Sequence, residues 1–539
     1  MTNPKPIIWT ISGSDCSGGA GIAADIKTGH GLGVEVCHLI TANTVQNSHQ
    51  LMAVNPVGVD ILQQQVAVLT VDKPPAVIKI GLLATLAQVT WLTSKLAQLK
   101  QQLPKLIVVY DPVGQASVGG SFNGFSLNDL TPLLQQIDVI TPNLMEANTL
   151  VDAALQTQDK QLKPISAELL AKNIYQNFAI NSIIIKGGHS NDSEQCVDFC
   201  YHQLNQLKQD NQEKTHHLAC YQLRSPRIKT HYSHGGGCCF ASAISAFLAQ
   251  GYLVRDAFTL AKAFINQGLA ATSSLSSAQQ HNYYGAFEPL TWPSEAQYFP
   301  TIVSNNDEDS QQLAAFPSLE LKKEKLGLYP VVSSLYWLQR LLPLGLNIIQ
   351  LRVKNLPLAE LEHTIKETIE LAKNYSCRLF INDYWQLAIK HGAYGVHIGQ
   401  EDLAEADLAK IQQAGLRLGI STHGCYEFLL AQQLQPSYLA VGAIFPTKTK
   451  DMTGQIQGIE NLRQLLALRS KSRTPQLSTH DDDAYIPVVA IGGISLARAS
   501  QVLATAVDSI AVVTAITEAT QPELAVEKFK QLISLSYSK

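Results

Sequence analysis

The sequence predicts an α/β protein with two large domains. The chain has 539 residues, and at about 150 residues per domain this length excludes a single compact core. Hydrophobic residues make up 46% of it and charged residues 16%, so most of the chain can fold. Short apolar runs alternate with longer stretches of helical period, which is the pattern of parallel strands joined by helices.

The first predicted domain covers residues 1–285 and contains six apolar runs of strand length. Nearly every run ends in small or polar residues. Open α/β sheets bind ligands beyond the carboxyl ends of their strands, so this pattern predicts a binding site along one edge of a sheet. The six runs are Ile7–Ile11, Leu39–Thr41, Val77–Ile80, Leu106–Tyr110, Val139–Ile140 and Ser182–Ile185.

The stretch 286–325 interrupts the alternation with prolines, aromatic residues and charges, and we interpret it as a linker. Gln203–His217 and Ser470–Asp483 are polar and are expected to be surface insertions. Residues 326–539 then contain eight strand candidates, which predict a closed TIM-type (β/α)₈ barrel. The eight candidates are Tyr329–Val332, Ile348–Leu351, Arg378–Ile381, Gly395–Ile398, Arg417–Ile420, Tyr438–Val441, Val488–Ile491 and Ser509–Val513.

Charge and composition narrow the class of partner. Lys plus Arg number 40 and Asp plus Glu 44, a net charge of −4, which is too balanced for binding nucleic acid or an anionic membrane by charge. No apolar run approaches the roughly 20 residues that span a bilayer, and the N-terminus lacks the pattern of a secretion signal. The nine cysteines form neither a disulfide framework nor a zinc spacing. We therefore expect a cytoplasmic protein that acts on small molecules, with its oligomeric state left open.

Two glycine-rich segments in the first domain suggest anion binding. Ser12–Gly21 follows the first strand, although a tight turn would explain its glycines equally well. Ser233–Phe240, with three consecutive glycines, precedes an Ala-rich helical pattern. A helix start of this kind exposes N–H groups and the positive end of the helix dipole, which suit phosphate oxygens. The same field is expected to lower the pKa of Cys238, unless Cys238 is a small packing residue.

Six motifs in the first domain resemble those of the hydroxymethylpyrimidine and phosphomethylpyrimidine kinase family, in the same order. They are SGSDCSGGAGIAADIKT, ITANTVQNS, IKIGLL, ITPNLMEAN, IIKGGH and HGGGCC. The resemblance implies a ribokinase-like three-layer α/β fold. It also implies an enzyme that uses ATP to phosphorylate the pyrimidine alcohol and then phosphorylates the product again to the diphosphate.

The resemblance also assigns roles to residues of the first domain. Cys238 corresponds to the cysteine that replaces the catalytic Asp of sugar kinases. The remaining assignments are pyrimidine contacts for Gly13, Asp25 and Gln46, the metal and phosphate region for Asn143 and Glu146, a nucleotide-proximal position for Lys186, and an anion hole for Gly235, Gly236, Gly237 and Cys238.

The chain departs from this family in two places. The usual Gly-Thr-Gly-Cys-Thr reads GGGCC at residues 235–239, and the stretch after Val113 reads GQASVGGSF. Two alternatives therefore stay open. The first domain could be an inactive kinase-like module that binds and senses the pyrimidine, or it could phosphorylate a pyridoxal-type alcohol.

In the second domain, polar residues follow the strand candidates. Gln350, Arg352 and Lys354 alternate along one strand and so share a face, where the two cations suit a diphosphate or form a solvated basic fringe. Asp383 and Asp402 follow the next two strands. Neighbouring strands lie about 4.8 Å apart, so these carboxylates can converge on one Mg²⁺ whose other ligands are water and phosphate oxygens.

Further polar groups continue this pattern at the remaining strands. Ser421 and the run Thr447–Lys450 follow two strands, and Gly492–Gly493 and Val513–Thr514 follow the last two. The last two positions match the phosphate site of many barrels. Singly each is an ordinary turn, but together they favour catalysis at this end of the barrel.

The second domain resembles the thiamine-phosphate synthase family from about Leu328 to Thr517. Its motifs include IQLRVK, FINDYWQLAI, YGVHIGQEDL, LGISTH, VGAIFPTKTKD, VVAIGGI and AVVTAIT. The resemblance implies that a carbocation forms as diphosphate leaves the pyrimidine methylene, and that the thiazole nitrogen attacks this carbocation. It assigns the pyrimidine diphosphate to Gln350, Leu351, Arg352, Val353, Lys354, Asn382, Ser421 and Lys450, Mg²⁺ to Asp383 and Asp402, and the thiazole phosphate to Thr447, Lys448, Thr449, Gly493, Val513 and Thr514.

The two resemblances fit one reaction sequence. The diphosphate that the first family makes is a substrate of the second. The sequence therefore predicts a bifunctional enzyme of thiamine biosynthesis that uses ATP and Mg²⁺.

Overall fold

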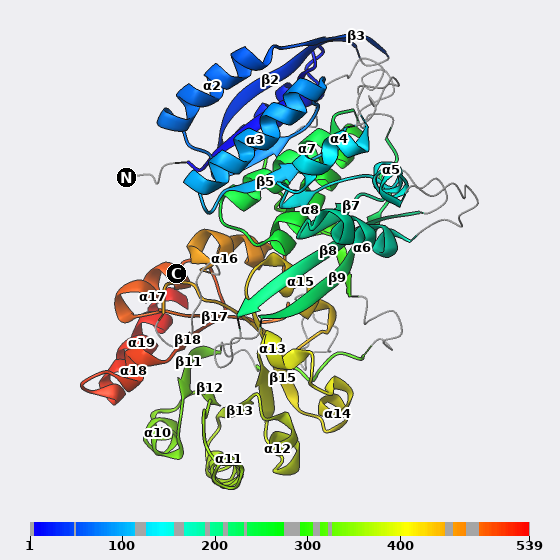
Figure 1. Cartoon of the computed structure of the whole chain (residues 1–539). Helices are drawn as coiled ribbons and strands as arrows, with labels where there is room; N and C mark the ends of the chain where they lie inside the picture. The colour runs from blue at the N-terminus through cyan, green and yellow to red at the C-terminus, as the bar shows by residue number, and fades with distance from the viewer. Residues whose placement is uncertain are drawn as a thin grey trace. The chain divides into compact units, whose positions relative to one another are not determined.

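The computed structural model describes residues 5–47, 50–113, 126–155, 166–188, 194–207, 214–230, 234–273, 291–304, 313–321, 326–447, 456–470 and 485–537. The chain forms two compact units, Met1–Ser310 and Gln311–Lys539 (Figure 1). Among the helices of the described residues, none is both long and apolar enough to cross a membrane.

The first unit is built on one mixed sheet. Its described strands are β1 (Ile7–Ser14), β2 (Glu35–Gln46), β3 (Leu51–Pro56), β4 (Val77–Ile80), β5 (Ile107–Tyr110), β6 (Val139–Ile140), β7 (Ser182–Ile185), β8 (Gln195–Leu207), β9 (Lys214–Pro226) and β10 (Thr301–Ser304). They lie in the order β10-β9-β8-β7-β6-β5-β4-β1-β2-β3. The six strands from β7 to β2 in this order are parallel, and the strands at the two edges are antiparallel. All six predicted runs are strands.

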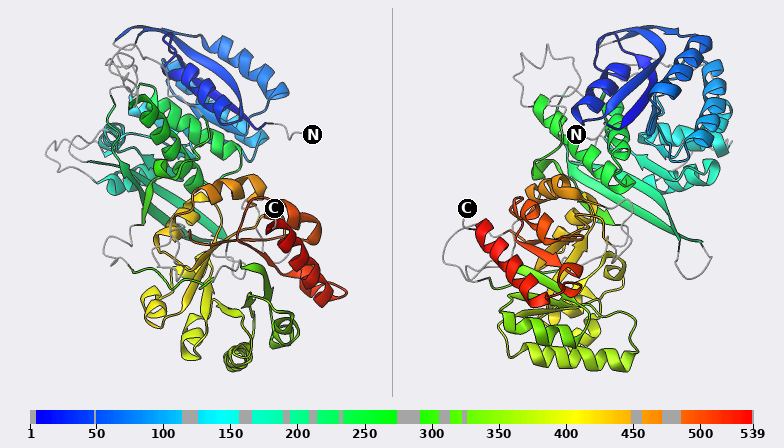
Figure 2. Two further views of the ribbon diagram at one scale, coloured as in Figure 1. Left: turned by 180° about the vertical axis from the view of Figure 1, so that it is seen from behind. Right: turned by 90° about the vertical axis from the view of Figure 1, so that its left-hand side faces the viewer.

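Helices cover both faces of this sheet (Figure 2). They are α1 (Gly21–Gly31), α2 (Val59–Asp72), α3 (Leu86–Gln102), α4 (Leu127–Leu134), α5 (Leu144–Leu155), α6 (Ala167–Phe178), α7 (Gly236–Ala249) and α8 (Val254–Ser273), with a short 3₁₀ helix at Ala296–Tyr298. Helices α1, α7 and α8 pack together, and α2 to α6 form the other layer. Trp9, Leu92 and Ile174 are fully buried in the core on the α2 to α6 side. The predicted three-layer α/β fold is confirmed.

Both polar stretches of this unit contain strands of the sheet. The described ends of Gln203–His217 belong to β8 and β9, which pair from Gln195 with Pro226 to Leu207 with Lys214. The stretch 286–325 is more than a linker, since β10 pairs with β9 inside it. Antiparallel edge strands carry many polar residues, so hydrophobicity alone does not identify them. Residues 471–483 of the other predicted insertion lie outside the described residues.

The second unit is a closed parallel barrel. The eight predicted strands are confirmed, and their ends differ from the predicted ends by at most two residues. The strands are β11 (Gly327–Val332), β12 (Ile348–Leu351), β13 (Arg378–Asn382), β14 (Gly395–Ile398), β15 (Arg417–Thr422), β16 (Tyr438–Val441), β17 (Val488–Ile491) and β18 (Ser509–Val512). Pairing of β11 with β18 closes the barrel.

Helices follow the strands, and one end of the barrel is closed by the preceding segment. The helices are α10 (Leu335–Leu341), a 3₁₀ helix (Leu342–Leu344), α11 (Leu358–Ala372), α12 (Trp385–Lys390), α13 (Gln400–Leu403), α14 (Leu408–Gln413), α15 (Cys425–Gln433), α16 (Gly458–Ala467), α17 (Leu496–Leu503), α18 (Thr514–Thr517) and α19 (Pro522–Tyr537). Leu319 is buried in the barrel core, and its carbonyl accepts a hydrogen bond from Arg378 Nε at the start of β13 (2.6 Å). Residues 313–321 therefore cover the end where the strands begin and leave the carboxyl end for the site.

Candidate active sites

The two glycine-rich segments of the first unit touch each other. Gly235 precedes α7 with φ +76°, and a Cβ atom there would lie 1.9 Å from the carbonyl oxygen of Gly19. Gly21 has φ +55°, and its Cβ would lie 2.2 Å from the oxygen of Gly13. No side chain fits at either position. The loop after β1 therefore lies against the first turn of α7.

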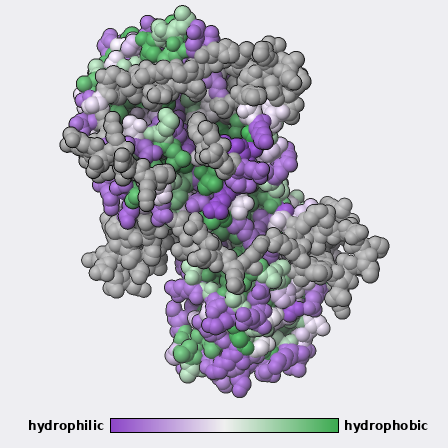
Figure 3. Space-filling model, turned by 90° about the vertical axis from the view of Figure 1, so that its right-hand side faces the viewer, coloured by the Kyte–Doolittle hydropathy of each residue, from purple (hydrophilic) through white to green (hydrophobic). Residues whose placement is uncertain are grey.

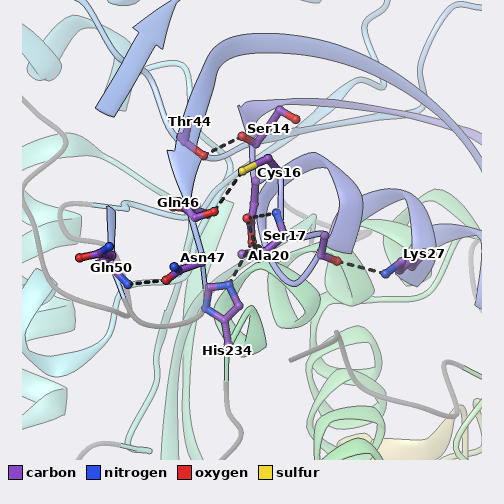
Figure 4. A network of polar contacts seen from close by, with 12 residues as sticks. Ser14, Cys16, Ser17, Ala20, Lys27, Thr44, Gln46, Asn47, Gln50 and His234 are labelled. Carbon is purple, nitrogen blue, oxygen red and sulfur yellow. Dashed lines mark hydrogen bonds and ion pairs between the residues drawn. The ribbon is translucent and has the colours of Figure 1, made fainter. Parts of the chain in front are cut away.

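Asp15 holds this junction together, and Figure 4 labels its partners Ser17, Ala20 and His234. Its carboxylate accepts hydrogen bonds from the backbone N–H groups of Ser17 (2.8 Å) and Ala20 (2.9 Å). It also contacts Nε2 of His234 at 3.0 Å, one residue before Gly235. Burial alone would raise the pKa of Asp15, but hydrogen bonds from His234, Gln46 and Ser17 hold that pKa well below its usual range. Gln46, an expected pyrimidine contact, therefore lies beside this carboxylate.

Asp25, another expected pyrimidine contact, is buried in a polar cluster. It is fully buried, and its carboxylate contacts Lys79 Nζ at 2.9 and 3.0 Å. The hydroxyl groups of Thr10 and Ser242 also donate to it. These groups surround the Asp25 carboxylate, and its contact with the pyrimidine stays a prediction. Asp25 instead balances the charge of the equally buried Lys79.

A second Lys–Asp pair faces the first turn of α7. Lys186 Nζ donates to Asp111 Oδ1 at 2.7 Å, and Thr141 Oγ1 donates to the same oxygen at 3.0 Å. A Cβ atom on Gly237 would lie 3.4 Å from Lys186 Nζ and 3.5 Å from Asp111 Oδ2. The glycine turn thus leaves its N–H groups next to an ammonium and a carboxylate, which suits phosphate oxygens and a bound cation.

Asn143 and Glu146, the expected metal and phosphate residues, lie at the start of α5. The backbone N–H of Asn143 donates to Glu146 Oε2 (2.8 Å), and that of Glu146 donates to Asn143 Oδ1 (2.9 Å). The backbone of Asn143 also forms an isolated parallel β-bridge with that of Lys186. Burial raises the pKa of Glu146 to about 7, with Lys186 opposing the shift and Asp111 adding to it.

The pKa of Cys238 differs from the expectation. Burial raises it to about 11; Lys79 opposes this shift, and the carboxylates of Asp25 and Asp111 add to it. The prediction of a lowered pKa is therefore wrong, because loss of hydration outweighs the positive charges nearby. Cys238 is only partly buried and lies on the first turn of α7. It rests as a neutral thiol beside the glycine turn.

In the barrel, the two predicted metal ligands approach each other. Burial raises the pKa of Asp383 to about 6, the nearby carboxylate of Asp402 raises it further, and Arg352 opposes both. Asp383 has φ +63° and accepts a hydrogen bond from the side-chain amide of Asn382. No group of three or more His, Cys, Asp or Glu residues gathers around a metal position in the described part of the chain. Two carboxylates suit Mg²⁺, which keeps several waters and phosphate oxygens.

The residues of the motif around β12 lie partly in the candidate site and partly in the barrel core. Gln350 is 4% exposed and donates through Nε2 to the hydroxyl of Tyr329 (3.4 Å). Leu351 and Val353 are buried apolar side chains, so the expectation of substrate contact can apply only to their main chain. Lys354 is exposed and Arg352 half-buried, as expected for cations at a strand end.

Ser421 belongs to a chain of polar groups that the sequence did not reveal. His397 contacts Ser421 Oγ through Nε2 (2.8 Å) and the hydroxyl of Tyr438 through Nδ1 (2.7 Å). The hydroxyls of Tyr438 and Tyr329 are 2.7 Å apart. Burial lowers the pKa of His397 to about 3, helped by Arg352 and His423, so its imidazole is neutral. The motif YGVHIGQEDL contains His397, but no spacing marks it as facing Ser421.

The predicted thiazole phosphate positions lie in adjacent loops where they are described. Gly493 has φ +61°, and its Cβ would lie 2.6 Å from the oxygen of Pro446, the residue before Thr447. Val513 precedes α18, which begins at Thr514. Lys448, Thr449 and Lys450 lie outside the described residues.

Comparisons with known proteins divide the chain in the same way. The family model described as phosphomethylpyrimidine kinase matches residues 15–283, and that described as thiamine monophosphate synthase matches residues 328–516. A thiamine-phosphate synthase of Yersinia pestis (strain Pestoides F) is 54% identical over 218 residues, 40% of this chain and 94% of the relative.

Solved structures also resemble the chain. The structure of the pyridoxal kinase from Staphylococcus aureus in complex with ADP has a TM-score of 0.40 and 27% identity, and covers 50% of this chain and 89% of the kinase. A phosphomethylpyrimidine kinase from Clostridium difficile 630 has a TM-score of 0.37 and 26% identity, with coverages of 48% and 98%.

Proposed function

Because the chain belongs to the thiamine-phosphate synthase family through its second domain and carries a phosphomethylpyrimidine kinase domain before it, we propose that it catalyses three consecutive steps. It combines pyrimidine phosphate kinase and thiamine-phosphate synthase activities of thiamine biosynthesis. The chain also carries out the first phosphorylation, that of 4-amino-5-hydroxymethyl-2-methylpyrimidine. Both phosphorylations use ATP, and the kinase and synthase reactions require Mg²⁺. Since ATP is the phosphoryl donor, we place the sequence of reactions in the cytoplasm.

In the kinase domain, the proposal rests on the first turn of α7 facing the Lys186–Asp111 pair. The pyrimidine lies near Gly13 and Gln46, and the N–H groups of Gly235 to Cys238 stabilise the charge on the transferred phosphoryl group. The bond between the terminal phosphorus and the ADP oxygen breaks as the substrate oxygen bonds to phosphorus. The thiolate form of Cys238, a small fraction at neutral pH, accepts the proton of the substrate hydroxyl and becomes the thiol. Asp111 and Glu146 would hold Mg²⁺, which neutralises phosphate charge when bound.

In the barrel, the proposal rests on the converging carboxylates of Asp383 and Asp402. They would hold Mg²⁺, which stabilises the leaving diphosphate when bound. Arg352 and Lys354 add positive charge, and Ser421 and Asn382 bind the pyrimidine diphosphate. The bond from the methylene carbon to diphosphate breaks, and a bond to the thiazole nitrogen forms. That nitrogen carries no proton to lose, so no general base is required.

The thiazole phosphate is expected on the loops after the last strands. Gly493 and Thr514 offer backbone N–H groups there, and Val513 and Thr447 lie beside them. Lys448, Thr449 and Lys450 complete the expected set.

An end-product assay tests the three-step sequence. The intact chain is given hydroxymethylpyrimidine, thiazole phosphate, ATP and Mg²⁺, and thiamine phosphate and both pyrimidine phosphates are measured. Thiamine phosphate should form with ATP present and should not form without it. The Cys238→Ser variant should make thiamine phosphate only when the pyrimidine diphosphate is supplied. A chain that binds the pyrimidine but makes no phosphorylated product would favour a sensing module.

A competition assay distinguishes the pyridoxal alternative. Hydroxymethylpyrimidine and pyridoxal are supplied together at equal concentration with limiting ATP. We expect phosphate to be transferred mainly to the pyrimidine. Preferential phosphorylation of pyridoxal would overturn the substrate assignment but leave the kinase assignment intact.

A further inference from the structure

A chain of hydrogen bonds crosses the barrel from Gln350 to Ser421. Its contacts run from Gln350 Nε2 to Tyr329 (3.4 Å), from Tyr329 to Tyr438 (2.7 Å), from Tyr438 to His397 Nδ1 (2.7 Å) and from His397 Nε2 to Ser421 Oγ (2.8 Å). Tyr329, Tyr438, His397 and Gln350 are each at most 6% exposed. Water therefore has little access to the interior members of the chain.

The amide at one end sets the direction of every bond in this chain. An amide nitrogen can only donate, so the oxygen of Tyr329 accepts from Gln350. The hydroxyl proton of Tyr329 is then free for Tyr438, and that of Tyr438 for His397 Nδ1. A neutral imidazole that accepts at Nδ1 carries its proton on Nε2, so it donates to Ser421.

The opposite direction needs the amide of Gln350 turned so that its oxygen faces Tyr329. If Ser421 donated to His397, the protons would run toward Tyr329, whose hydroxyl could donate to Gln350 Oε1 but not to Nε2. With Nε2 facing Tyr329, that direction leaves an unpaired buried donor, which costs about 1–3 kcal/mol. The contact of Gln350 Nε2 with Tyr329 therefore favours the direction from Gln350 to Ser421.

We propose that Tyr329, Tyr438 and His397 are positioning residues that make the hydroxyl of Ser421 a hydrogen-bond donor to the diphosphate of the pyrimidine substrate. Since Ser421 already accepts from His397, its own proton is available to the ligand. Gln400 Nε2 fixes the main chain here by donating to the carbonyl of Ser421 (2.6 Å). The donor would stabilise negative charge that grows on the leaving group. This inference rests on the proposed binding of the diphosphate at Ser421.

The first test measures which nitrogen of His397 carries the proton. In ligand-free intact protein labelled with ¹⁵N-histidine, the His397 signals are assigned by comparison with His397→Gln. The ¹⁵N shifts should show the proton on Nε2. A proton on Nδ1 in the parent protein would overturn the proposal without any further variant, and it would leave the synthase assignment untouched.

The second test reverses the chain. In Gln350→Glu the carboxylate can only accept, so the protons should run the other way and the His397 proton should move to Nδ1. Tyr438→Phe interrupts the chain of hydrogen bonds. The double variant Tyr438→Phe/Gln350→Glu should therefore carry the His397 proton on the same nitrogen as Tyr438→Phe alone. An unchanged tautomer in Gln350→Glu, or an equal change in the double variant, would exclude transmission through the tyrosines.

The third test separates positioning from mere packing. Tyr438→Phe should lower kcat for coupling about tenfold with little change in KM, and should lower it no further when Ser421 is already Ala, because the two residues act as one unit. The same loss from Tyr438→Phe in both backgrounds would show that Tyr438 acts on folding or packing instead.

Discussion

The two domains differ in the polar groups that they bury near their candidate phosphate sites. Three Lys–Asp pairs with little exposure lie in the kinase domain: Lys79 with Asp25, Lys186 with Asp111, and Lys262 with Asp198. The interior of the barrel instead carries a chain of neutral phenol, imidazole and amide groups. Hydrophilic and hydrophobic residues are interspersed on the molecular face drawn in Figure 3.

The difference follows from the two folds. At the edge of an open sheet, helices and loops from several directions can bring an opposite charge to each ion. A barrel interior is enclosed by strands on all sides, and an ion buried there loses hydration that few groups can replace. Substitutions in the kinase domain should therefore act through uncompensated charge, and substitutions in the barrel through hydrogen-bond direction and metal binding.

The largest effect is expected at Cys238. Cys238→Ser should lower kinase turnover about 10²- to 10⁴-fold, the usual contribution of a proton-transfer group. Coupling of supplied pyrimidine diphosphate by the same preparation should be unchanged, which serves as the control for folding. The measurement is ADP release for the kinase and thiamine phosphate for the synthase. Unchanged kinase turnover would reduce Cys238 to a packing residue.

Breaking the fully buried ion pair should destabilise the kinase domain. Lys79→Met leaves the Asp25 carboxylate uncompensated and should lower the free energy of unfolding by about 3–5 kcal/mol. The double variant Lys79→Met/Asp25→Leu should recover most of this loss, because no charge remains buried. The measurement is unfolding by denaturant, with the loss of kinase activity as the signal that reports unfolding of this domain. Equal instability of both variants would mean that packing and not charge dominates here.

The pH dependence of the kinase follows from the raised pKa of Cys238. With a pKa of about 11, the thiolate fraction at neutral pH is small and increases as pH rises. Kinase kcat should therefore rise about tenfold per pH unit, since each unit below the pKa changes the thiolate fraction by that factor. Initial rates from pH 7 to 9 at saturating substrates test this. A flat profile would exclude Cys238 as the base.

The smallest effect is expected for the metal at the barrel rim. Asp383→Asn should raise the Mg²⁺ concentration needed for half-maximal coupling about tenfold, because a carboxylate binds this ion better than an amide does. The exposed Glu360 on α11 is a matched control, and Glu360→Gln should titrate like the parent. Identical Mg²⁺ titrations for Asp383→Asn and the parent would remove Asp383 from the ligand set.

The sequence could place candidate residues where their position depends on the order of the chain. The residues at strand ends, such as Asp383, Asp402 and Ser421, could be named because parallel strands bring their carboxyl ends to one edge. The sequence could not show which carboxylates are buried. Asp25 lies in a recognisable motif, yet its carboxylate belongs to Lys79, and no local pattern distinguishes a buried carboxylate from an exposed one.

By itself, the sequence determined the fold class, the parallel strands and the two families. Hydrophobic period and motif order are properties of neighbouring residues, so they can be read along the chain. The tertiary structure alone decided which charges are paired in the interior, why Cys238 holds its proton, and that His397 joins Tyr438 to Ser421. Those properties depend on dehydration and on contacts between residues distant in the chain, neither of which a linear pattern records.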